Sequence, residues 1–156
     1  MTQSAAALSP DATAAIADAL NQCVAETAVT TMLAQNFHWN VTGMAFGPLH
    51  DLFQKIYEDH FVAQDDLAER IKALDAHAEG TLAGMLARSK VSEHDGHGSD
   101  KDMIAAMQAA QETLASTLAG AGELAASHGD TLTEDLCIAR GQEHEKFAWF
   151  LRSHLR

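Results

Sequence analysis

Two histidines and two carboxylates are the residues of this sequence whose types and spacing could carry out chemistry. His38 and His50 come first, 12 residues apart, and Asp65 and Glu69 follow, four residues apart. Imidazole nitrogens and carboxylate oxygens are ligands for a transition metal that has some affinity for oxygen. These residues predict a metal site only if the fold brings them together.

The distance along the chain is an obstacle to such a site. Residues 48–75 are expected to form one helix, in which His50 and Asp65 would lie about 22 Å apart at 1.5 Å per residue. A single chain folded in this way cannot bring both side chains to one metal ion. His38 is different, because it lies at the expected end of the preceding helix and can approach His50 through the turn.

A second copy of the chain would remove the obstacle. At about 100° per residue, Asp65 lies about 60° and Glu69 about 100° from His50 around the helix axis, so all three share one side. An antiparallel copy of the helix, crossing near Tyr57 and Glu58, would place His50 of one chain beside the two carboxylates of the other. The two-fold symmetry would create two equivalent sites.

Each half of this arrangement also has a simpler interpretation. Asp65 and Glu69 can be a solvated acidic patch on a helix, and a histidine at a helix end, such as His38, often caps or packs. A di-iron site within one bundle generally uses Glu-x-x-His pairs. No Glu-x-x-His occurs in the sequence, which argues against such a site within one chain.

The composition favours an all-helical chain that positions these residues. Apolar residues make up 47% of 156 residues, Pro occurs only twice, and β-branched residues form no long run. We expect a flexible N-terminal tail over residues 1–8 and a single domain over residues 9–156.

Helical spacing of apolar residues predicts four long helices. The first begins at Ser9-Pro10-Asp11, the second at Gly47-Pro48, the third at a capping box over residues 99–102, and the last at a second capping box over residues 131–134. A short helical piece, residues 81–88, lies in the connection between the second and third helices. This order predicts a four-helix bundle with one long crossover.

Charge and targeting signals limit the partners and the compartment. The net charge is −12, and no Lys or Arg precedes Lys55, so binding to DNA phosphates is expected to be weak or absent. Cys23 and Cys137 are expected to be buried thiols in a reducing cytoplasm. No signal peptide or run of 18 apolar residues is visible, so we expect neither a leader nor a membrane span.

The sequence resembles the Dps family (DNA-binding proteins from starved cells), also called miniferritins, over residues from about 10 to 155. The resemblance is carried by Phe37-His38-Trp39-Asn40-Val41-Thr42-Gly43, by Leu49-His50, by Asp65-x-x-Ala68-Glu69-Arg70-Ile71, and by His144-Glu145-Lys146-x-Ala148-Trp149-x-Leu151-Arg152. The spacing between the two histidines and Asp65, and the short helical piece, also match the family. The resemblance implies a ferritin-like four-helix bundle.

The resemblance further implies a hollow shell of twelve subunits with ferroxidase sites at two-fold interfaces. His38 and His50 would come from one subunit, and Asp65 and Glu69 from its partner. Members of the family oxidise Fe²⁺, preferentially with hydrogen peroxide rather than O₂, and store ferric mineral, which protects the cell and its DNA. Trp39 resembles the site-proximal tryptophan of the family and would either intercept stray oxidising equivalents or only pack.

By the same analogy, acidic pores would lie near the start of the last helix, with Asp130, Glu134 and Asp135 as candidates. Two other functions stay open: a DNA-compacting structural protein, and a shell whose site holds another metal, such as Zn²⁺. The basic tail that many family members use for DNA is not expected here, because residues 1–20 contain no Lys or Arg.

Three further histidines are prominent in the sequence. His60 interrupts the apolar stripe of the second helix and is expected to be a core histidine with satisfied hydrogen bonds rather than a metal ligand. His94 and His97 lie in the segment His94-Asp95-Gly96-His97-Gly98, which is either a solvated loop or a surface metal site.

Overall fold

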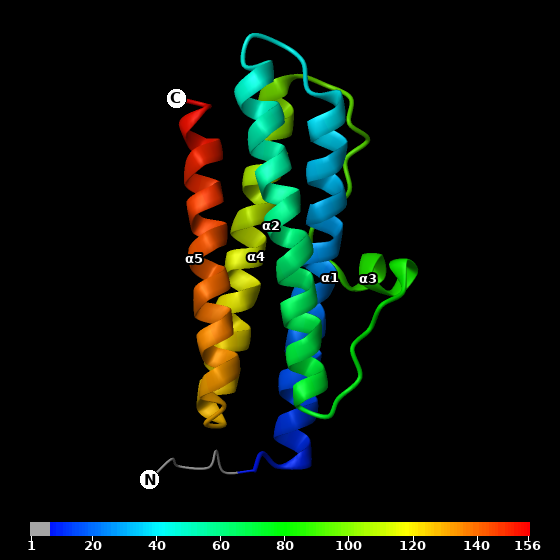
Figure 1. Cartoon of the computed structure of the whole chain (residues 1–156), viewed down its shortest axis with the longest axis vertical. Helices are drawn as coiled ribbons and strands as arrows, with labels where there is room; N and C mark the ends of the chain where they lie inside the picture. Colours follow the sequence, from blue (N-terminus) through cyan, green and yellow to red (C-terminus); the bar gives the residue numbers. More distant parts are fainter. Residues whose placement is uncertain (1–6) are drawn as a thin grey trace.

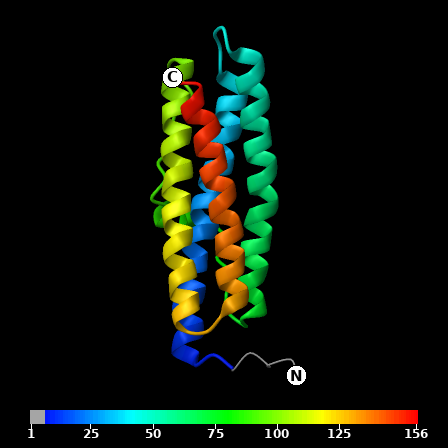
Figure 2. The same ribbon diagram turned by 90° about the vertical axis from the view of Figure 1, so that its left-hand side faces the viewer.

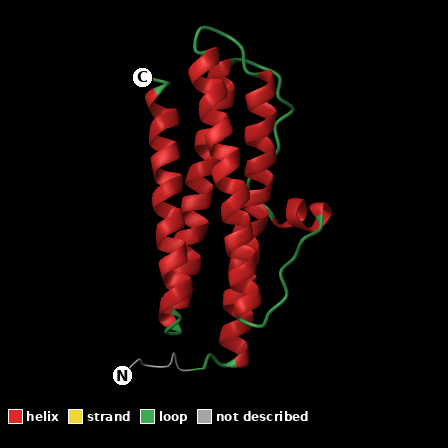
Figure 3. Ribbon diagram, in the orientation of Figure 1, coloured by secondary structure: helices red, strands yellow, loops and turns green. Residues whose placement is uncertain are grey.

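The structure is a computed structural model that describes residues 7–156, and these residues form five helices. In chain order the helices are α1 (Pro10–Asn40), α2 (Phe46–Ala73), α3 (Leu82–Arg88), α4 (Asp100–Ser127) and α5 (Thr131–Ser153). Residues 7–156 contain no strand (Figure 3), so the prediction of an all-α fold is confirmed.

The four long helices lie side by side, and the short helix α3 stands outside the bundle against α1 (Figures 1 and 2). The turn between α1 and α2 lies at one end of the bundle and the turn between α4 and α5 at the other. The connection from α2 to α4 therefore runs the length of the bundle and contains α3, which is the predicted long crossover.

The helix starts follow the predicted capping signals with one exception. The Ser9 hydroxyl accepts a hydrogen bond from the Ala12 N–H (3.1 Å), and Ser99 forms a capping box with Asp102. The prediction that Thr131 caps the last helix is wrong. Asp130 is the cap, because its carboxylate accepts the Thr133 N–H (3.2 Å).

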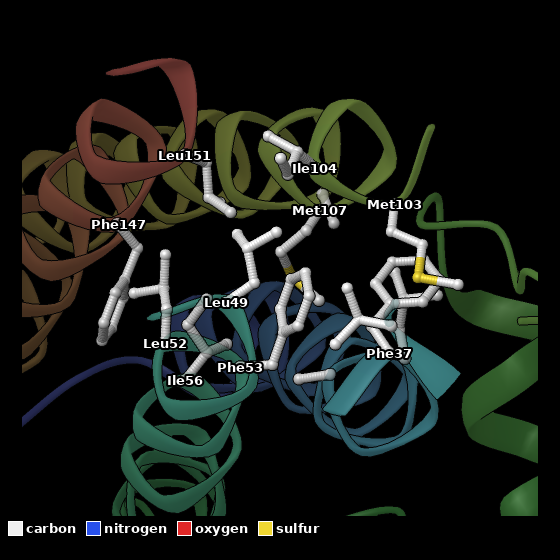
Figure 4. Close-up of a cluster of buried hydrophobic side chains, with 14 of the residues drawn as sticks. Phe37, Leu49, Leu52, Phe53, Ile56, Met103, Ile104, Met107, Phe147 and Leu151 are labelled. Atoms are coloured by element: carbon white, nitrogen blue, oxygen red, sulfur yellow. The ribbon is translucent and has the colours of Figure 1, made fainter. Parts of the chain in front are cut away.

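The hydrophobic core places the two candidate histidines. Phe37 and Leu49 are fully buried in the core cluster at the α1–α2 turn, next to Phe53 (Figure 4). Each lies directly before a histidine in the sequence, so burial of Phe37 and Leu49 fixes the backbone from which His38 and His50 project. Full burial of such side chains stabilises the fold by about 2 kcal/mol each.

The N-terminal tail predicted over residues 1–8 mostly lies outside the described residues. Leu8, which was assigned to this tail, is half-buried and packs against the core cluster at the start of α1. Among residues 7–156, no helix has an apolar stretch long enough to cross a membrane.

Candidate metal centre

His38 and His50 lie directly against each other where α1 ends and α2 begins. Their rings are stacked, with centroids 3.7 Å apart and planes inclined by 15°. His38 is buried, and His50 is half-buried. The prediction that the two histidines approach each other through the turn is therefore confirmed.

Reciprocal hydrogen bonds fix which nitrogen of each ring carries the proton. His38 Nδ1 lies 2.7 Å from the His50 carbonyl oxygen, and His50 Nδ1 lies 2.7 Å from the His38 carbonyl oxygen. A carbonyl oxygen only accepts, so each Nδ1 donates its proton, and each neutral ring keeps a lone pair on Nε2. Neither Nε2 has a hydrogen-bond partner within residues 7–156. This is the tautomer that a metal-binding histidine needs.

The turn between the helices depends on Gly43. Its φ of 109° is in the left-handed region, and a Cβ there would meet the Asp100 carboxylate at 3.0 Å. Its carbonyl oxygen accepts the Phe46 N–H (3.1 Å), which starts α2. This short turn holds the end of α1 and the first turn of α2 close enough for the two histidines to meet.

Asp65 and Glu69 lie in the C-terminal half of α2, and both are exposed. They make no hydrogen bond or ion pair within residues 7–156. In that part of the chain, no three His, Cys, Asp or Glu side chains come together in a group that could hold a metal ion. The structure thus brings together the two histidines, and it leaves the two carboxylates apart from them, as the helix length predicts.

Two aromatic side chains contact the histidine pair, and a third, Trp39, follows His38 in the sequence. Tyr57 packs edge-on against His38 (centroids 5.3 Å), and Phe46 stacks on His50 (5.1 Å, 26°). Trp39 is 63% exposed, so packing within one chain does not account for it. Phe46 was not among the predicted site residues, although its position four residues before His50 places both on one helix face.

The pore candidates differ in their surroundings. Asp130 is buried and forms an ion pair with Arg70 (3.0 Å), and it also binds the Thr133 hydroxyl. These contacts within the chain occupy its carboxylate, and its place in a pore lining stays a prediction. Glu134 is half-buried and Asp135 is exposed, so both stay candidates.

A second pair of histidines lies inside the bundle, in a closed ring of hydrogen bonds. Arg140 donates to both carboxylate oxygens of Asp59 (3.1 and 2.7 Å) and to His144 Nε2 (3.4 Å). His144 Nδ1 donates to the Gln111 oxygen (2.7 Å), the Gln111 nitrogen donates to His60 Nε2 (3.0 Å), and His60 Nδ1 donates to Asp59 (2.9 Å). His60 is therefore a satisfied core histidine, as predicted.

The electrostatics of this ring keep both histidines neutral. Burial lowers the pKa of His60, and burial with the nearby positive charges lowers the pKa of His144 to about 2. Burial alone would raise the pKa of Asp59, but hydrogen bonds from His60 and Arg140 outweigh it and hold that pKa well below its usual range. All four imidazole nitrogens of the ring have a partner, so none is left for a metal.

The His94 to Gly98 segment makes contacts of a structural kind. His94 Nδ1 accepts the Gly96 N–H (3.0 Å), and the Asp95 carboxylate accepts the His97 N–H (2.9 Å). The His94 ring also packs edge-on against Phe37 (5.1 Å). No third ligand completes a metal site here among the described residues, which favours the loop interpretation.

The two cysteines are buried and free, as predicted. Burial raises the pKa of Cys23 far above its usual range, and burial with nearby Asp130 raises the pKa of Cys137 to about 11. Both are therefore protonated thiols near neutral pH and are not metal ligands in this state.

Comparison with known proteins identifies the family of the chain. The family model for the ferritin-like domain matches residues 17–156. DNA protection during starvation protein 2 from Bacillus anthracis is 31% identical over 140 residues, which cover 90% of this chain and 96% of the relative.

Solved structures show the same fold. A Dps protein from Bacillus brevis is 30% identical with a TM-score of 0.91, covering 96% of this chain and all of that one. The Dps protein from Vibrio cholerae O1, described as a member of a broad superfamily of ferritin-like diiron-carboxylate proteins, is 29% identical with a TM-score of 0.90 over 99% of this chain. The chain therefore belongs to the Dps family of ferritin-like proteins.

Proposed function

We propose that this protein is a ferroxidase that stores iron and protects against oxidative damage in the cytoplasm. Its sites would form between two copies of the chain, with His38 and His50 from one copy and Asp65 and Glu69 from the other. Membership in a ferritin-like family associated with iron storage supports the general function. The assignment of residues rests on the geometry of the chain itself.

The observation that carries the proposal is the state of the histidine pair. His38 and His50 donate both Nδ1 protons to each other's backbone and keep both Nε2 lone pairs unoccupied within the described chain. His38 is buried and His50 is half-buried, and an imidazole held in this tautomer can bind a cation through its unoccupied Nε2. Residues 7–156 offer no third ligand nearby, which supports ligands from a second molecule.

The second copy is the partner that best supplies those ligands. In an antiparallel pair of α2 helices crossing between Tyr57 and Glu58, residues whose numbers add to 115 lie level with each other. Asp65 of one copy is then level with His50 of the other. The exposed position of Asp65 and Glu69, without a partner among residues 7–156, is consistent with this role.

The chemistry of these ligands suits iron as a substrate. Neutral imidazoles and carboxylates bind Fe²⁺, and the negative carboxylates stabilise the Fe³⁺ product. With hydrogen peroxide as the preferred oxidant, two Fe²⁺ ions each give up one electron, and the peroxide with two protons becomes two water molecules. This reaction removes both reactants that would otherwise form hydroxyl radicals.

The angle between the rings favours two neighbouring iron ions in each site. An imidazole binds a metal along a direction in its ring plane, and two planes inclined by only 15° at 3.7 Å do not aim both lone pairs at one point. We infer that His38 and His50 each bind one Fe²⁺ ion, and that Asp65, Glu69 and water lie between the two ions.

A shell of twelve chains would give the negative charge a function. Twelve chains of −12 carry about −144 before counterions, a field that concentrates Fe²⁺ at the surface. Glu134 and Asp135, at the start of α5, are the proposed lining of the entry pores. The same charge repels phosphate, so a gel-shift at low salt is expected to show weak or no retention of DNA.

Iron oxidation in site variants tests the proposal. We expect the double variant Asp65→Ala/Glu69→Ala to oxidise Fe²⁺ at least about 100-fold more slowly than wild type with peroxide, at unchanged oligomer mass. The matched control is Asp66→Ala/Glu112→Ala, which removes the same charges from exposed positions away from the proposed ligands. Unchanged oxidation in the first variant would exclude Asp65 and Glu69 as ligands.

Zinc is expected to compete for the same site. All four ligands also accept Zn²⁺, and the Irving–Williams order places Zn²⁺ above Fe²⁺ in affinity. Zn²⁺ should therefore inhibit wild-type oxidation at concentrations comparable to Fe²⁺, with inhibition relieved by a chelator.

A further inference from the structure

The histidine pair is part of a longer row of aromatic rings. Phe46 stacks on His50 (centroids 5.1 Å, 26°), His50 stacks on His38 (3.7 Å, 15°), and Tyr57 packs edge-on against His38 (5.3 Å, 83°). Tyr57 is half-buried against the core, whereas Phe46 is 46% exposed at the outer end of the row. The two inner rings are the proposed iron ligands, and the two outer rings have no ligand atom of that kind.

Backbone contacts hold Phe46 in this place. It is the first residue of α2, and its N–H donates to the Gly43 carbonyl oxygen (3.1 Å). In the next turn, Leu49 N–H donates to the Ala45 carbonyl oxygen (3.0 Å), so the helix is already formed where His50 follows. Residues four apart lie above each other on a helix, which brings the Phe46 ring over the His50 ring.

The orientation of His50 has only a few supports. One is the Nδ1 hydrogen bond to the His38 carbonyl oxygen, and the others are the two ring faces that cover it, His38 and Phe46. The hydrogen bond alone leaves the ring free to swing about the N–H···O axis. A flat ring on each side removes that freedom and fixes the direction of the Nε2 lone pair.

We propose that Phe46 is a positioning residue for the proposed Fe²⁺ ligand His50. Its ring holds the His50 ring in the plane that metal binding requires. The inference rests on the proposed function of His50 as a ligand. In the antiparallel dimer, Phe46 is level with Glu69 of the other copy, since their numbers add to 115. The same ring would therefore also border the carboxylate ligands and cover one side of the completed site.

Three substitutions at position 46 distinguish the effect of a flat aromatic ring from the effect of side-chain volume. Phe46→Leu keeps an apolar side chain of similar size without the flat face, Phe46→Ala removes the cover, and Phe46→Tyr keeps the ring as the matched control. Co²⁺ under anaerobic conditions is the probe, because its visible absorption reports both affinity and ligand geometry. Fe²⁺ oxidation with peroxide is measured on the same preparations, together with oligomer mass by light scattering.

We expect Phe46→Leu and Phe46→Ala to weaken Co²⁺ binding about tenfold and to change its visible spectrum, as loss of a supporting residue does at metal sites. The apparent KM for Fe²⁺ should rise by a similar factor. The maximal rate should stay within about twofold, because at saturating Fe²⁺ the His50 ring is held in its binding orientation by the bound metal. Phe46→Tyr should match wild type, and the oligomer mass should be the same throughout.

Two results would overturn the inference. One is wild-type Co²⁺ affinity and spectrum in Phe46→Leu, and the other is weakened binding only together with loss of the oligomer, which would assign Phe46 to assembly. Failure of the proposed function looks different. In that case His38→Ala/His50→Ala would bind Co²⁺ and oxidise Fe²⁺ as wild type does, whatever residue occupies position 46.

Discussion

The molecule contains two histidine pairs that resemble each other in composition and differ in their hydrogen bonds. At the end of the bundle, His38 and His50 use one nitrogen each and leave Nε2 unoccupied in the described chain. In the centre of the bundle, His60 and His144 use both nitrogens in a closed ring with Gln111, Asp59 and Arg140. The rings of the terminal pair are stacked with centroids 3.7 Å apart, and those of the central pair lie edge-on with centroids 4.8 Å apart.

The difference lies in the hydrogen bonds and not in the residue types. The central pair faces a fixed positive charge, the Arg140 guanidinium, in the region of a bundle where related folds place metal ligands. Within residues 7–156 the terminal pair makes no ion pair with a cation, and each of its rings has one hydrogen-bonded nitrogen and one unoccupied nitrogen. The central pair should therefore contribute to stability and the terminal pair to iron chemistry.

The largest expected effect concerns the central ring. Asp59→Ala removes the carboxylate that pairs with Arg140 and leaves a buried guanidinium without this counter-charge. We expect a loss of about 3–5 kcal/mol in the free energy of unfolding. Urea unfolding at equal protein concentration measures it, with Asp66→Ala, an exposed carboxylate on the same helix, as the control. A loss below about 1 kcal/mol would show that solvent already reaches Arg140.

The pH dependence of stability tests the same ring. In the folded chain the pKa values of His60 and His144 lie below the ordinary value of 6.5. The unfolded chain therefore binds protons that the folded chain does not. The free energy of unfolding should be independent of these histidines above about pH 6.5. Below that pH it should fall by about 1.4 kcal/mol per pH unit for each histidine.

Urea unfolding between about pH 7.5 and 5.5 measures this slope, a range in which carboxylates contribute little. His144→Gln should lose about half of the slope. A stability that stays constant to pH 5.5 in the wild type would contradict neutral burial of the pair.

The terminal pair, His38 and His50, should be needed for iron oxidation and should contribute little to stability. We expect His38→Ala/His50→Ala to oxidise Fe²⁺ with peroxide about 100-fold more slowly, a loss of about 2.7 kcal/mol in transition-state stabilisation. Its unfolding midpoint in urea should change much less than that of Asp59→Ala. If stability fell by as much as in Asp59→Ala while oxidation survived, the roles assigned to the two pairs would be reversed.

The dimer prediction involves a residue that touches no ligand. Phe61 is 73% exposed on α2, close to the proposed crossing point, and should be covered in the dimer. Phe61→Asp is expected to reduce oligomer mass in light scattering and to reduce iron oxidation with it, whereas Phe61→Leu retains both. Normal oxidation in a Phe61→Asp preparation shown to be monomeric would refute a site shared between chains.

A smaller effect on stability is expected at the turn between α4 and α5. Arg70, which follows Glu69 in α2, donates to Asp130 and to the Thr133 hydroxyl (2.9 Å). Arg70→Ala should cost about 1–3 kcal/mol of stability, because the buried Asp130 carboxylate loses its cation. Urea unfolding compares it with Lys72→Ala, an exposed cation two residues later, for which a change within about 0.5 kcal/mol is expected.

The sequence was sufficient for the features that depend on local pattern. Apolar spacing and capping residues placed the helices within one or two residues, and the rise per residue showed that His50 and Asp65 cannot meet within one chain. Position relative to the core also predicted a satisfied role for His60.

Other features depend on contacts between distant segments and could not be predicted. The reciprocal hydrogen bonds of His38 and His50 need the helix ends at a specific separation, and the closed ring needs α2, α4 and α5 in register. Asp130 was named as a pore candidate by family analogy alone. Its ion pair with Arg70, 60 residues away in the sequence, depends on packing of α2 against the start of α5 and was not predicted.

Mixing two inactive variants tests most directly whether each site is shared between two chains. One variant lacks both histidines (His38→Ala/His50→Ala), and the other lacks both carboxylates (Asp65→Ala/Glu69→Ala). After co-refolding in equal amounts, half of the dimers contain one chain of each kind, and each of these has one complete shared site. About a quarter of the wild-type rate of Fe²⁺ oxidation should return. If the mixture oxidises iron no faster than either variant alone, although mixed oligomers have formed, the site is not shared between chains.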